Sequence, residues 1–477
     1  MPPISSPFDS YMLILSSNAG KYNIVSLLSA HIILGDIMMD SIWENGAVLP
    51  RFPQLDTDLN TDVLIIGGGL AGLLCAWNLT CAGVDCTLIE ENRLMQGVSG
   101  RTTAKLTSQH GLIYGPLLKK FGVERARLYW QANQAAVESL CALAENANCD
   151  FTRENNYLYA TGSTEKLEAE MAAYGVLGIP AHWENSLPLP FPVSGALCFS
   201  NQGQFHPLKL AAHISKGLRI FENTKALAFV GNRVETPKGV IRAKKIIVAT
   251  HFPMLNKHGF YFLKLYQQRS YVIALENAPQ LQGMYLDSEE NGLSLRSAGP
   301  WLLLGGGGHR TGKQGLGWKL PESAAKAYFP QAGIAARWAT QDCMSLDGMP
   351  YIGNYSSLTP DLYVATGFHK WGMSSAMAAA MLLTDLVQDK ENPYASLFSP
   401  SRSIFHKQLL CNCLETTVNL LRPTRPRCPH LGCALHWNKA EHSWDCSCHG
   451  SRFDKNGNVL NNPATADMKH PPRRNCK

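Results

Sequence analysis

The stretch TDVLIIGGGLAG, residues 61–72, decides the fold of this chain. A short apolar run, typical of a buried parallel strand, leads into Gly67, Gly69 and Gly72 at G-x-G-x-x-G spacing. The first glycine permits a tight turn, the second lets the backbone approach a pyrophosphate, and the third lets the next helix pack closely on the strand. Glu90 ends the next apolar run, where a carboxylate can accept both hydroxyls of a ribose. The pattern predicts a Rossmann-like parallel sheet with a bound dinucleotide; a glycine turn without a ligand is the alternative.

Length and charge divide the chain into parts. At 477 residues it is too long for one ordinary core, and 45% hydrophobic with 17% charged residues is typical of a globular protein. The net charge of +6 belongs to the tail, because residues 401–477 contain twelve Lys or Arg against five Asp or Glu. Such a surface would suit an acidic partner, although a solvated basic terminus is an equal alternative.

Residues 1–40 form a leader of uncertain status. The apolar tract 22–39 is short and is interrupted by His31 and Asp36, so we expect no stable membrane span. Neither a basic start nor a small-residue cleavage site marks a secretory signal, and Met38 or Met39 could be the true start. We therefore expect a cytoplasmic protein, and the clustering of several cysteines at ligand-like spacings after residue 410 agrees with this.

Two polar or small-residue segments are candidates to contact the same dinucleotide. The loop GVSGRTTAKLTSQHG, residues 97–111, could hydrogen-bond phosphate and ring edges, or could be a simple connection. Its candidate residues are Ser99, Arg101, Thr102 and Thr103. In residues 362–386 a strand runs into Gly367, and a small-residue helix begins near Gly372 and Met373. The free N–H groups of that helix would face an anionic cofactor edge, although its composition also suits plain close packing.

The middle of the chain reads as an antiparallel sheet with interspersed helices. The run KIIVAT, residues 245–250, then returns to the parallel sheet, because a continuous apolar strand implies burial on both faces. The polar candidates for a substrate pocket are Arg269, Tyr271, His309 and Arg310. Each of these taken alone is more often structural than catalytic.

These segments together resemble the glycine and D-amino-acid oxidase family of FAD-dependent oxidoreductases. The glycine motif with Glu90, the SGRTTAK loop, VATH at 248–251, DGMPYIG at 347–353 and ATGFHKWG at 365–372 carry the resemblance. It implies an FAD-dependent oxidoreductase over residues 41–395. The FAD-binding sheet would use segments of about 58–112, 205–253 and 340–390, and a mixed-sheet substrate domain would use about 150–200 and 257–335. The flavin's pyrimidine edge would lie near Gly372 and Met373.

The chain also departs from this family in two places. Members that oxidise sarcosine have a lysine where Ser374 stands, which puts a carboxylate anchor at this position in doubt. VATH, ending in His251, replaces the more usual Ala-Thr-Gly. The identity of the substrate therefore does not follow from the resemblance.

The tail contains the most specific pattern of the sequence. Cys428, His430, Cys446 and His449 are spaced C-x-H-x15-C-x2-H. Two thiolates on one iron and two imidazoles on the other describe a Rieske [2Fe-2S] centre. The alternative is a structural zinc site, but zinc fingers usually pair C-x2-4-C with H-x3-5-H.

The longer patterns CPHLGC and CSCHGSRFD resemble the Rieske family. The resemblance implies that Cys433 and Cys448 form a disulfide between the cluster loops and that Ser451 hydrogen-bonds a bridging sulfide. Phe453 stands where high-potential members have a tyrosine that donates to a ligand sulfur, so we expect a lower potential. An all-β Rieske domain would span residues 424–477 after a linker helix in 396–423. Most opening strands of that fold are missing, so the flavin domain must support the cluster loops.

The two halves together predict a dehydrogenase more readily than an oxidase. An amine or amino acid would reduce FAD, and His430 and His449, expected at the exposed end of the cluster, would pass electrons to an external acceptor. The basic tail suggests an acidic ferredoxin or flavodoxin. An electron-transfer protein without an amine substrate, or a redox sensor, are the alternatives. No segment resembles a nucleic-acid-binding module.

Overall fold

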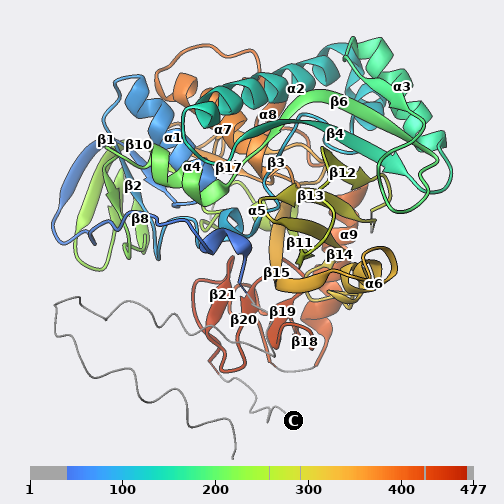
Figure 1. The fold of residues 1–477 in the computed structure, drawn as a ribbon. Helices are drawn as coiled ribbons and strands as arrows, with labels where there is room; N and C mark the ends of the chain where they lie inside the picture. Colours follow the sequence, from blue (N-terminus) through green and yellow to red (C-terminus); the bar gives the residue numbers. More distant parts are fainter. Residues whose placement is uncertain (1–39, 257, 291, 424–425, 470–477) are drawn as a thin grey trace, which may run out of the picture.

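The computed structural model describes residues 40–256, 258–290, 292–423 and 426–469 (Figure 1). The expected leader therefore lies, except for residue 40, outside the described residues. Within these ranges no helix has both the length and the apolar character needed to cross a membrane. The structure has the predicted α/β architecture, with a parallel sheet, a mixed sheet and a small antiparallel sheet.

The first sheet is built around the strand that precedes the glycine turn. Its main path runs β16-β17-β10-β1-β2-β7, in which β17 through β7 are parallel and β16 is an antiparallel edge. The strands are β1 (Leu59–Ile66), β2 (Cys86–Ile89), β7 (Ile220–Phe221), β8 (Ala228–Val230), β9 (Arg233–Glu235), β10 (Val240–Val248), β16 (Tyr351–Asn354) and β17 (Leu362–Thr366). The four C-terminal residues of β1 are all buried, as its apolar sequence predicts.

Helices pack on this sheet and on one another. They are η1 (Ile42–Glu44), α1 (Leu70–Cys81), η2 (Val98–Arg101), α2 (Tyr114–Glu145), α4 (Pro207–Ile214), α7 (Gly372–Val387) and α8 (Ala395–Phe398). The small residues of α7 let it pack against both α1 and α2. A kink at Gly122, where φ is +78°, interrupts α2.

The second sheet is mixed and forms the other wall of the molecule (Figure 1). Its main path is β15-β11-β14-β13-β12-β4-β6-β3, and only the β12–β4 pairing is parallel. The strands are β3 (Lys105–Leu106), β4 (Thr152–Ala160), β5 (His182–Glu184), β6 (Gly195–Gln204), β11 (Tyr266–Glu276), β12 (Met284–Asp287), β13 (Ser294–Ala298), β14 (Trp301–Arg310) and β15 (Gly333–Met344). Its helices are α3 (Glu165–Leu177), α5 (Tyr261–Lys264) and α6 (Lys319–Tyr328). The long strand β11 lies between β14 and β15, so its centre is fixed on both sides.

A small antiparallel sheet follows the linker helix α9 (Lys407–Leu421) and lies below β11 and β15 in Figure 1. Its strands, in order, are β18 (Leu435–Asn438), β19 (Ser443–Cys446), β20 (Arg452–Phe453) and β21 (Val459–Asn461). Between α9 and β18 the described residues contain only an isolated bridge, Arg427 to Ala434. The abbreviated sheet expected from the sequence is therefore observed.

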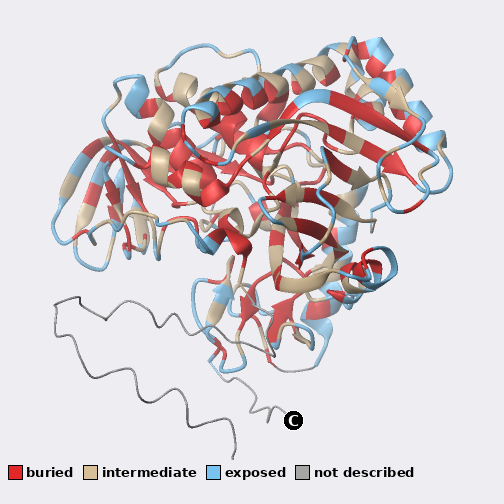
Figure 2. Cartoon of the chain, viewed as in Figure 1, coloured by how far each residue is buried: buried red, intermediate tan, exposed pale blue. Residues whose placement is uncertain are grey.

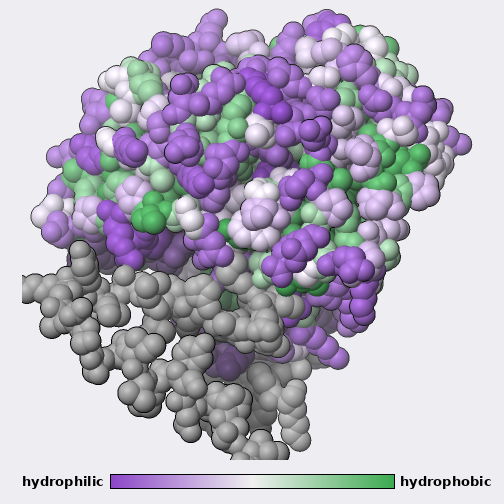
Figure 3. Space-filling model, viewed as in Figure 1, coloured by the Kyte–Doolittle hydropathy of each residue, from purple (hydrophilic) through white to green (hydrophobic). Residues whose placement is uncertain are grey.

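Burial follows the sheets. Figure 2 shows buried residues along much of the central strands and along the inner faces of the helices. On the face shown in Figure 3, hydrophilic residues cover much of the surface, with smaller hydrophobic areas between them.

Candidate functional site

A cavity of about 940 Å³ lies where the parallel strands end and the mixed sheet begins. The carboxyl ends of β1, β2 and β10 border one side, and β11, β14 and β15 border the other. This edge of an open α/β sheet is where ligands are generally bound. The predicted cofactor-binding residues that line it are Gly67, Gly69, Glu90, Ser99, Arg101, Thr102, Thr103, Gly367, Gly372 and Met373.

The glycine turn is packed so closely that side chains cannot be added. A Cβ at Gly67, where φ is +113°, would lie 2.5 Å from the carbonyl oxygen of Ala249. A Cβ at Gly72 would lie 1.9 Å from the carbonyl oxygen of Gly67. Gly72 does not line the cavity; it lets α1 begin directly beneath the turn, which is the third-glycine role predicted from the spacing. The turn thus forms a bare backbone cradle of the kind that a pyrophosphate requires.

Glu90 lies at the end of β2 with its carboxylate against the turn. Its two oxygens accept hydrogen bonds from the N–H groups of Gly68, at 2.7 Å, and Asn92, at 2.9 Å. Burial raises the pKa of Glu90, while these two N–H donors favour its charged form. The position agrees with the predicted ribose contact, which stays a prediction.

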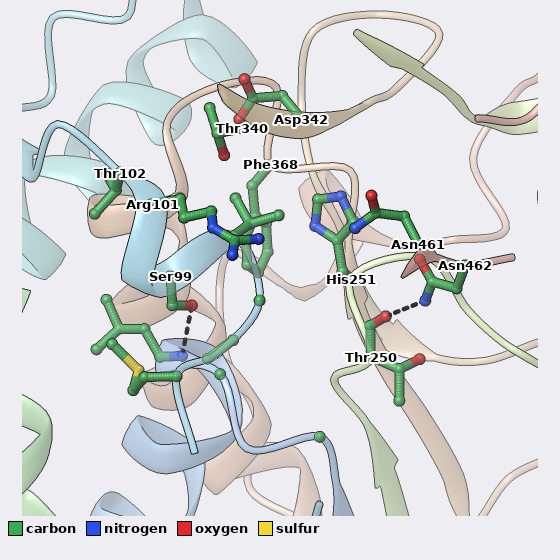
Figure 4. A pocket seen from close by; sticks show the side chains of 18 of the residues that line it. Ser99, Arg101, Thr102, Thr250, His251, Thr340, Asp342, Phe368, Asn461 and Asn462 are labelled. Atoms are coloured by element: carbon green, nitrogen blue, oxygen red, sulfur yellow. Dashed lines mark hydrogen bonds between the residues drawn. The ribbon is translucent and has the colours of Figure 1, made fainter. Parts of the chain in front are cut away.

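The polar loop after Glu90 crosses the cavity beside the start of α1. Ser99 Oγ accepts a hydrogen bond of 2.9 Å from the N–H of Leu70, the first residue of the helix (Figure 4). In Figure 4 Arg101 and His251 project into the cavity from opposite sides. The loop therefore presents hydroxyl and guanidinium groups to the space beside the glycine turn.

The segment before α7 has unusual backbone geometry. Gly367, His369 and Lys370 all have positive φ, at 71°, 52° and 72°. Two consecutive non-glycine residues in this region indicate a backbone that the surrounding structure holds in place. The loop brings Lys370 into the cavity and starts α7 at Gly372, so that the helix N-terminus faces the cavity as predicted.

The two cluster loops of the C-terminal sheet have matching backbones. Gly432 N–H donates to the carbonyl of Cys428, and Gly450 N–H donates to the carbonyl of Cys446, both at 2.9 Å. The loops bring the rings of His430 and His449 to 5.0 Å between centroids. The two predicted cysteine and two predicted histidine ligands are therefore gathered at one place.

The donor set fits a Rieske cluster. Cys428, Cys446 and His449 are buried, and the Nδ1 atoms of His430 and His449 are buried without a hydrogen-bond partner among the described residues. Buried polar atoms without a partner indicate a group that would satisfy them. A hydrogen bond from Cys428 is the main cause that lowers the pKa of the Cys446 thiol well below its usual value, which favours a thiolate ligand.

The predicted disulfide is not formed in the structure. Cys433 and Cys448 are free cysteines, and their sulfur atoms lie within 4.8 Å of each other and of Cys446 Sγ. The two loops are thus adjacent, and the pairing itself stays a prediction.

The histidine end of the cluster site is not exposed, contrary to our expectation. His449 is only 2% exposed, and its ring packs edge-on against Phe252 and Phe262 of the preceding domain, with centroids 6.4 Å apart in each case. His430 is half-buried, and its Nε2 lies 3.1 Å from Asn256 Oδ1. The expectation was wrong because the short C-terminal sheet docks through this end.

The four residues proposed as catalytic lie at the same domain contact. Tyr271 lines the cavity, whereas Arg269, His309 and Arg310 do not. Arg310 donates to the backbone carbonyls of Ser447, at 2.8 Å, and Cys448, at 3.0 Å. The rings of His309 and Tyr271 stack at 5.6 Å. Arg310 thus supports the second cluster loop, and of the four only Tyr271 stands at the cavity wall.

A buried charge network stabilises the contact between the flavin domain and the cluster domain. Arg269 forms a two-pronged ion pair with Glu441, whose carboxylate also accepts from Tyr271 Oη at 3.0 Å and from Arg452 Nη2 at 2.8 Å. Arg452 in turn pairs with Asp445 at 3.0 Å. The flavin domain thus contacts the cluster domain through buried charges. This agrees with the support that we expected because the tail lacks most opening strands of the Rieske fold.

The C-terminal part also completes the cavity wall. Residues 459–462 and 464–467 line the same cavity as the glycine turn. Asn462 Nδ2 donates to the carbonyls of Thr250, at 2.7 Å, and Phe252, at 3.1 Å (Figure 4). This wall was not predicted, since only the cluster ligands in the tail have a recognisable spacing.

Comparison with known proteins identifies both halves. Residues 62–386 match the family model of FAD dependent oxidoreductases, and residues 412–472 match that of the Rieske [2Fe-2S] domain. YhfW of Bacillus subtilis (strain 168), named for a Rieske 2Fe-2S iron-sulfur centre, is 35% identical over 90% of this chain and 97% of its own length.

Solved structures show the same fold for the flavin-binding part of the chain. Glycine oxidase from Geobacillus kaustophilus covers 72% of this chain and 100% of its own, with 22% identity and a TM-score of 0.61. L-proline dehydrogenase from P. horikoshii covers 72% and 98%, with 18% identity and the same TM-score. Together with the cavity and the paired cluster loops, these matches show that the chain belongs to the FAD-dependent oxidoreductases of the D-amino-acid oxidase family and has a C-terminal Rieske [2Fe-2S] domain.

Proposed function

We propose that this protein is an amine or amino-acid dehydrogenase that sends electrons through its Rieske domain to an external carrier. The shared cavity wall is the observation that carries the proposal: residues 459–462 of the cluster domain face the same space as the glycine turn 67–69. When bound, FAD takes two electrons from a substrate and the cluster passes them on singly. A cavity wall supplied by the cluster domain favours internal transfer over reaction with oxygen.

The substrate side of the cavity contains opposite charges. Asp342 and Lys370 both line it, and burial raises the pKa of Asp342 although Lys370 opposes the shift. Lys105 also lines it and donates to Tyr285 O at 2.6 Å. Burial lowers the pKa of Lys105 well below its usual value, so Lys370 is the cation of this pair. A carboxylate that accepts hydrogen bonds from an amine, beside a cation that attracts a carboxylate, suits a small amine or amino acid. The names of the glycine oxidase and proline dehydrogenase with this fold support that class.

The basic C-terminal part supports an acidic one-electron carrier, such as a ferredoxin or flavodoxin. Since His449 is covered, such a carrier would approach the less buried first cluster loop, where Pro429 and Leu431 are exposed. A cytoplasmic location is also part of the proposal, since cysteines of the tail have ligand-like spacings rather than those of a secreted disulfide framework.

Anaerobic mixing of the flavin- and iron-loaded protein with a panel of small amines and amino acids tests the proposal. We expect a member of the panel to bleach the flavin and then produce the EPR signal of the reduced cluster. Bleaching only by a reduced protein carrier would instead support an electron-transfer protein without an amine substrate. If the substrate bleaches the flavin but the cluster is never reduced, electron transfer through the Rieske domain is ruled out and an oxidase remains.

Asp342→Asn should lower kcat/KM for the amine by about 10²–10⁴-fold, the usual effect of removing a general base. The carboxylate faces the cavity and its raised pKa suits acceptance of a proton from a substrate ammonium. Wild-type kcat/KM should therefore rise as the pH rises through this pKa, and the variant should not show this pH-dependent rise. Steady-state kinetics across pH provide the measurement.

Asp287→Asn is the matched control, because burial also raises the pKa of Asp287, which does not line the cavity. This control should retain wild-type kinetics. Equal kinetics in the Asp342 and Asp287 variants would remove Asp342 from the reaction.

Phe453→Tyr should raise the reduction potential of the cluster. Phe453 is fully buried on β20, beside the strand that ends in the ligand Cys446. A hydroxyl that donates to a ligand sulfur stabilises the more electron-rich reduced cluster. Potentiometric titration followed by EPR should place the wild type below respiratory Rieske proteins and the variant above the wild type. A wild-type value already in the respiratory range would contradict this explanation.

A further inference from the structure

We propose that His251 and Gln267 form the route by which electrons cross from the flavin cavity to the cluster ligand His449. The inference rests on the proposed function and adds the residues that connect the two redox sites. It begins from His251, the residue at which VATH departs from the family pattern and for which the dinucleotide site gives no role.

His251 follows β10 and lines the cavity (Figure 4). Its Nε2 lies 3.1 Å from Gln267 Oε1. Because an amide oxygen only accepts, Nε2 carries the hydrogen. Burial lowers the pKa of His251 to about 4, so the ring is neutral near pH 7 and Nδ1 keeps its lone pair. The imidazole therefore joins the flavin side of the cavity to Gln267 without a net charge.

Gln267 lies on β11 and is buried, and its amide is fully hydrogen-bonded. Its Nε2 donates to the backbone carbonyls of His449, at 2.8 Å, and Asn462, at 3.0 Å. Its Oε1 accepts from His251 and from Gln341 Nε2, the latter at 2.7 Å. With both donors and both acceptor positions used, the amide has one orientation. Two hydrogen bonds thus connect a ring in the cavity to the backbone of a cluster ligand.

The second cluster loop packs directly against Gln267. A Cβ at Gly450, where φ is +89°, would lie 2.6 Å from Gln267 Cβ, so only glycine lets the cluster loop approach this closely. Gln341 Nε2 also donates to Gly450 O at 2.8 Å. The competing route is Phe252, whose ring lies 6.3 Å from that of His430 and 6.4 Å from that of His449. Those ring contacts have no hydrogen bond, whereas the His251 route is hydrogen-bonded at both steps.

The step balances as a one-electron transfer. With both groups bound, reduced FAD would give one electron to the oxidised cluster and a proton to the cavity. An external one-electron carrier would reoxidise the cluster before the second electron follows. His251 and Gln267 provide the connection, and no bond of either side chain forms or breaks.

Photoreduction of the holoprotein tests the route without a known substrate. Under anaerobic conditions, light with EDTA as donor reduces the flavin, and the rate at which electrons then reach the cluster is followed by absorbance and freeze-quench EPR. His251→Gly suits the positive φ of 65° and leaves every described contact of His449 in place. We expect His251→Gly and Gln267→Leu to slow arrival at the cluster about tenfold.

Gln341→Leu is the matched control. It removes one hydrogen bond to Gln267 Oε1 and one to the same cluster loop, but leaves the hydrogen bonds from His251 to Gln267 and from Gln267 to His449 in place. It should transfer electrons at the wild-type rate. Iron content, FAD content and the EPR spectrum after dithionite should be unchanged in His251→Gly, which a merely structural role at the cluster would alter.

Other outcomes overturn the proposal in distinguishable ways. A wild-type rate in His251→Gly, or slowing by Phe252→Leu alone, would overturn the route and leave the proposed function intact. If the photoreduced wild type fails to reduce its own cluster, both the route and the proposed function are overturned. If Gln267→Leu loses its cluster, the result with His251→Gly still tests the route. Among the described hydrogen bonds of its side chain, His251 reaches the cluster domain only through Gln267.

Discussion

Replacing Glu441 with alanine is expected to weaken the docking of the Rieske domain on the flavin domain by about 3–5 kcal/mol. The buried carboxylate of Glu441 bridges the guanidinium groups of Arg269 and Arg452, which are buried as well. Removing it leaves buried positive charge without a full counter-charge, which is more unfavourable than the loss of a contact. On heating, the cluster absorbance should therefore disappear before the flavin domain unfolds.

The same carboxylate gives docking an acid dependence. Burial alone would raise the pKa of Glu441, but the attraction of Arg269 and Arg452 outweighs it and lowers the pKa to about 2. Because this lies below the value of about 4.3 for an unfolded chain, the stabilisation is complete above that pH and is lost as the pH falls towards 2. Thermal melts between these values should show steeper acid destabilisation in the wild type than in the alanine variant.

Lys313→Ala provides the control for Glu441. Lys313 Nζ lies 2.6 Å from Glu415 Oε2 on the linker helix, but half of the lysine side chain is exposed. An exposed pair contributes at most about 1 kcal/mol. Equal melting of the two variants would show that the buried network does not hold the domains together.

Gly72→Ala should yield protein without FAD. The added Cβ would lie 1.9 Å from the carbonyl oxygen of Gly67, so either the turn or the start of α1 must move. Such overpacking destabilises by about 1–3 kcal/mol, and the displaced backbone is the cradle that faces the pyrophosphate. The ratio of flavin to protein absorbance in the purified protein measures the loss.

Gly175→Ala is the same chemical change in α3, where no atom lies within 4 Å of the added Cβ. Without a clash, the Gly175→Ala variant should bind FAD normally. It should also gain up to about 1 kcal/mol of stability, because alanine lowers the conformational entropy of the unfolded chain. Full flavin content in Gly72→Ala would contradict the role assigned to close packing at the turn.

Local sequence patterns predicted the features that depend on residues close together in the sequence. The turn at 67–72, the approach of Glu90 and the start of α7 each follow from spacing within one or two elements. The cluster ligands could also be predicted, since each loop carries one cysteine and one histidine at short spacing, C-x-H in the first and C-x2-H in the second. At these places local sequence and global fold agree.

The contact between the domains could not be predicted in the same way. Gln267 and His449 are separated by 182 positions, and Arg269 and Glu441 by 172, so neither sequence neighbourhood contains the other. Arg269 and Arg310 were noticed as polar residues on apolar strands, but their partners decide what they do. The missing opening strands of the tail predicted that the flavin domain supports the cluster loops, but not which residues do so.

Docking through the histidine end has a consequence for maturation. His449 is covered by Phe252 and Phe262, and the bond from Gln267 holds its backbone. The second cluster loop is therefore accessible to iron and sulfide only while the two domains are apart. We expect a variant with weakened docking, such as Glu441→Ala, to lose iron to a chelator faster than the wild type.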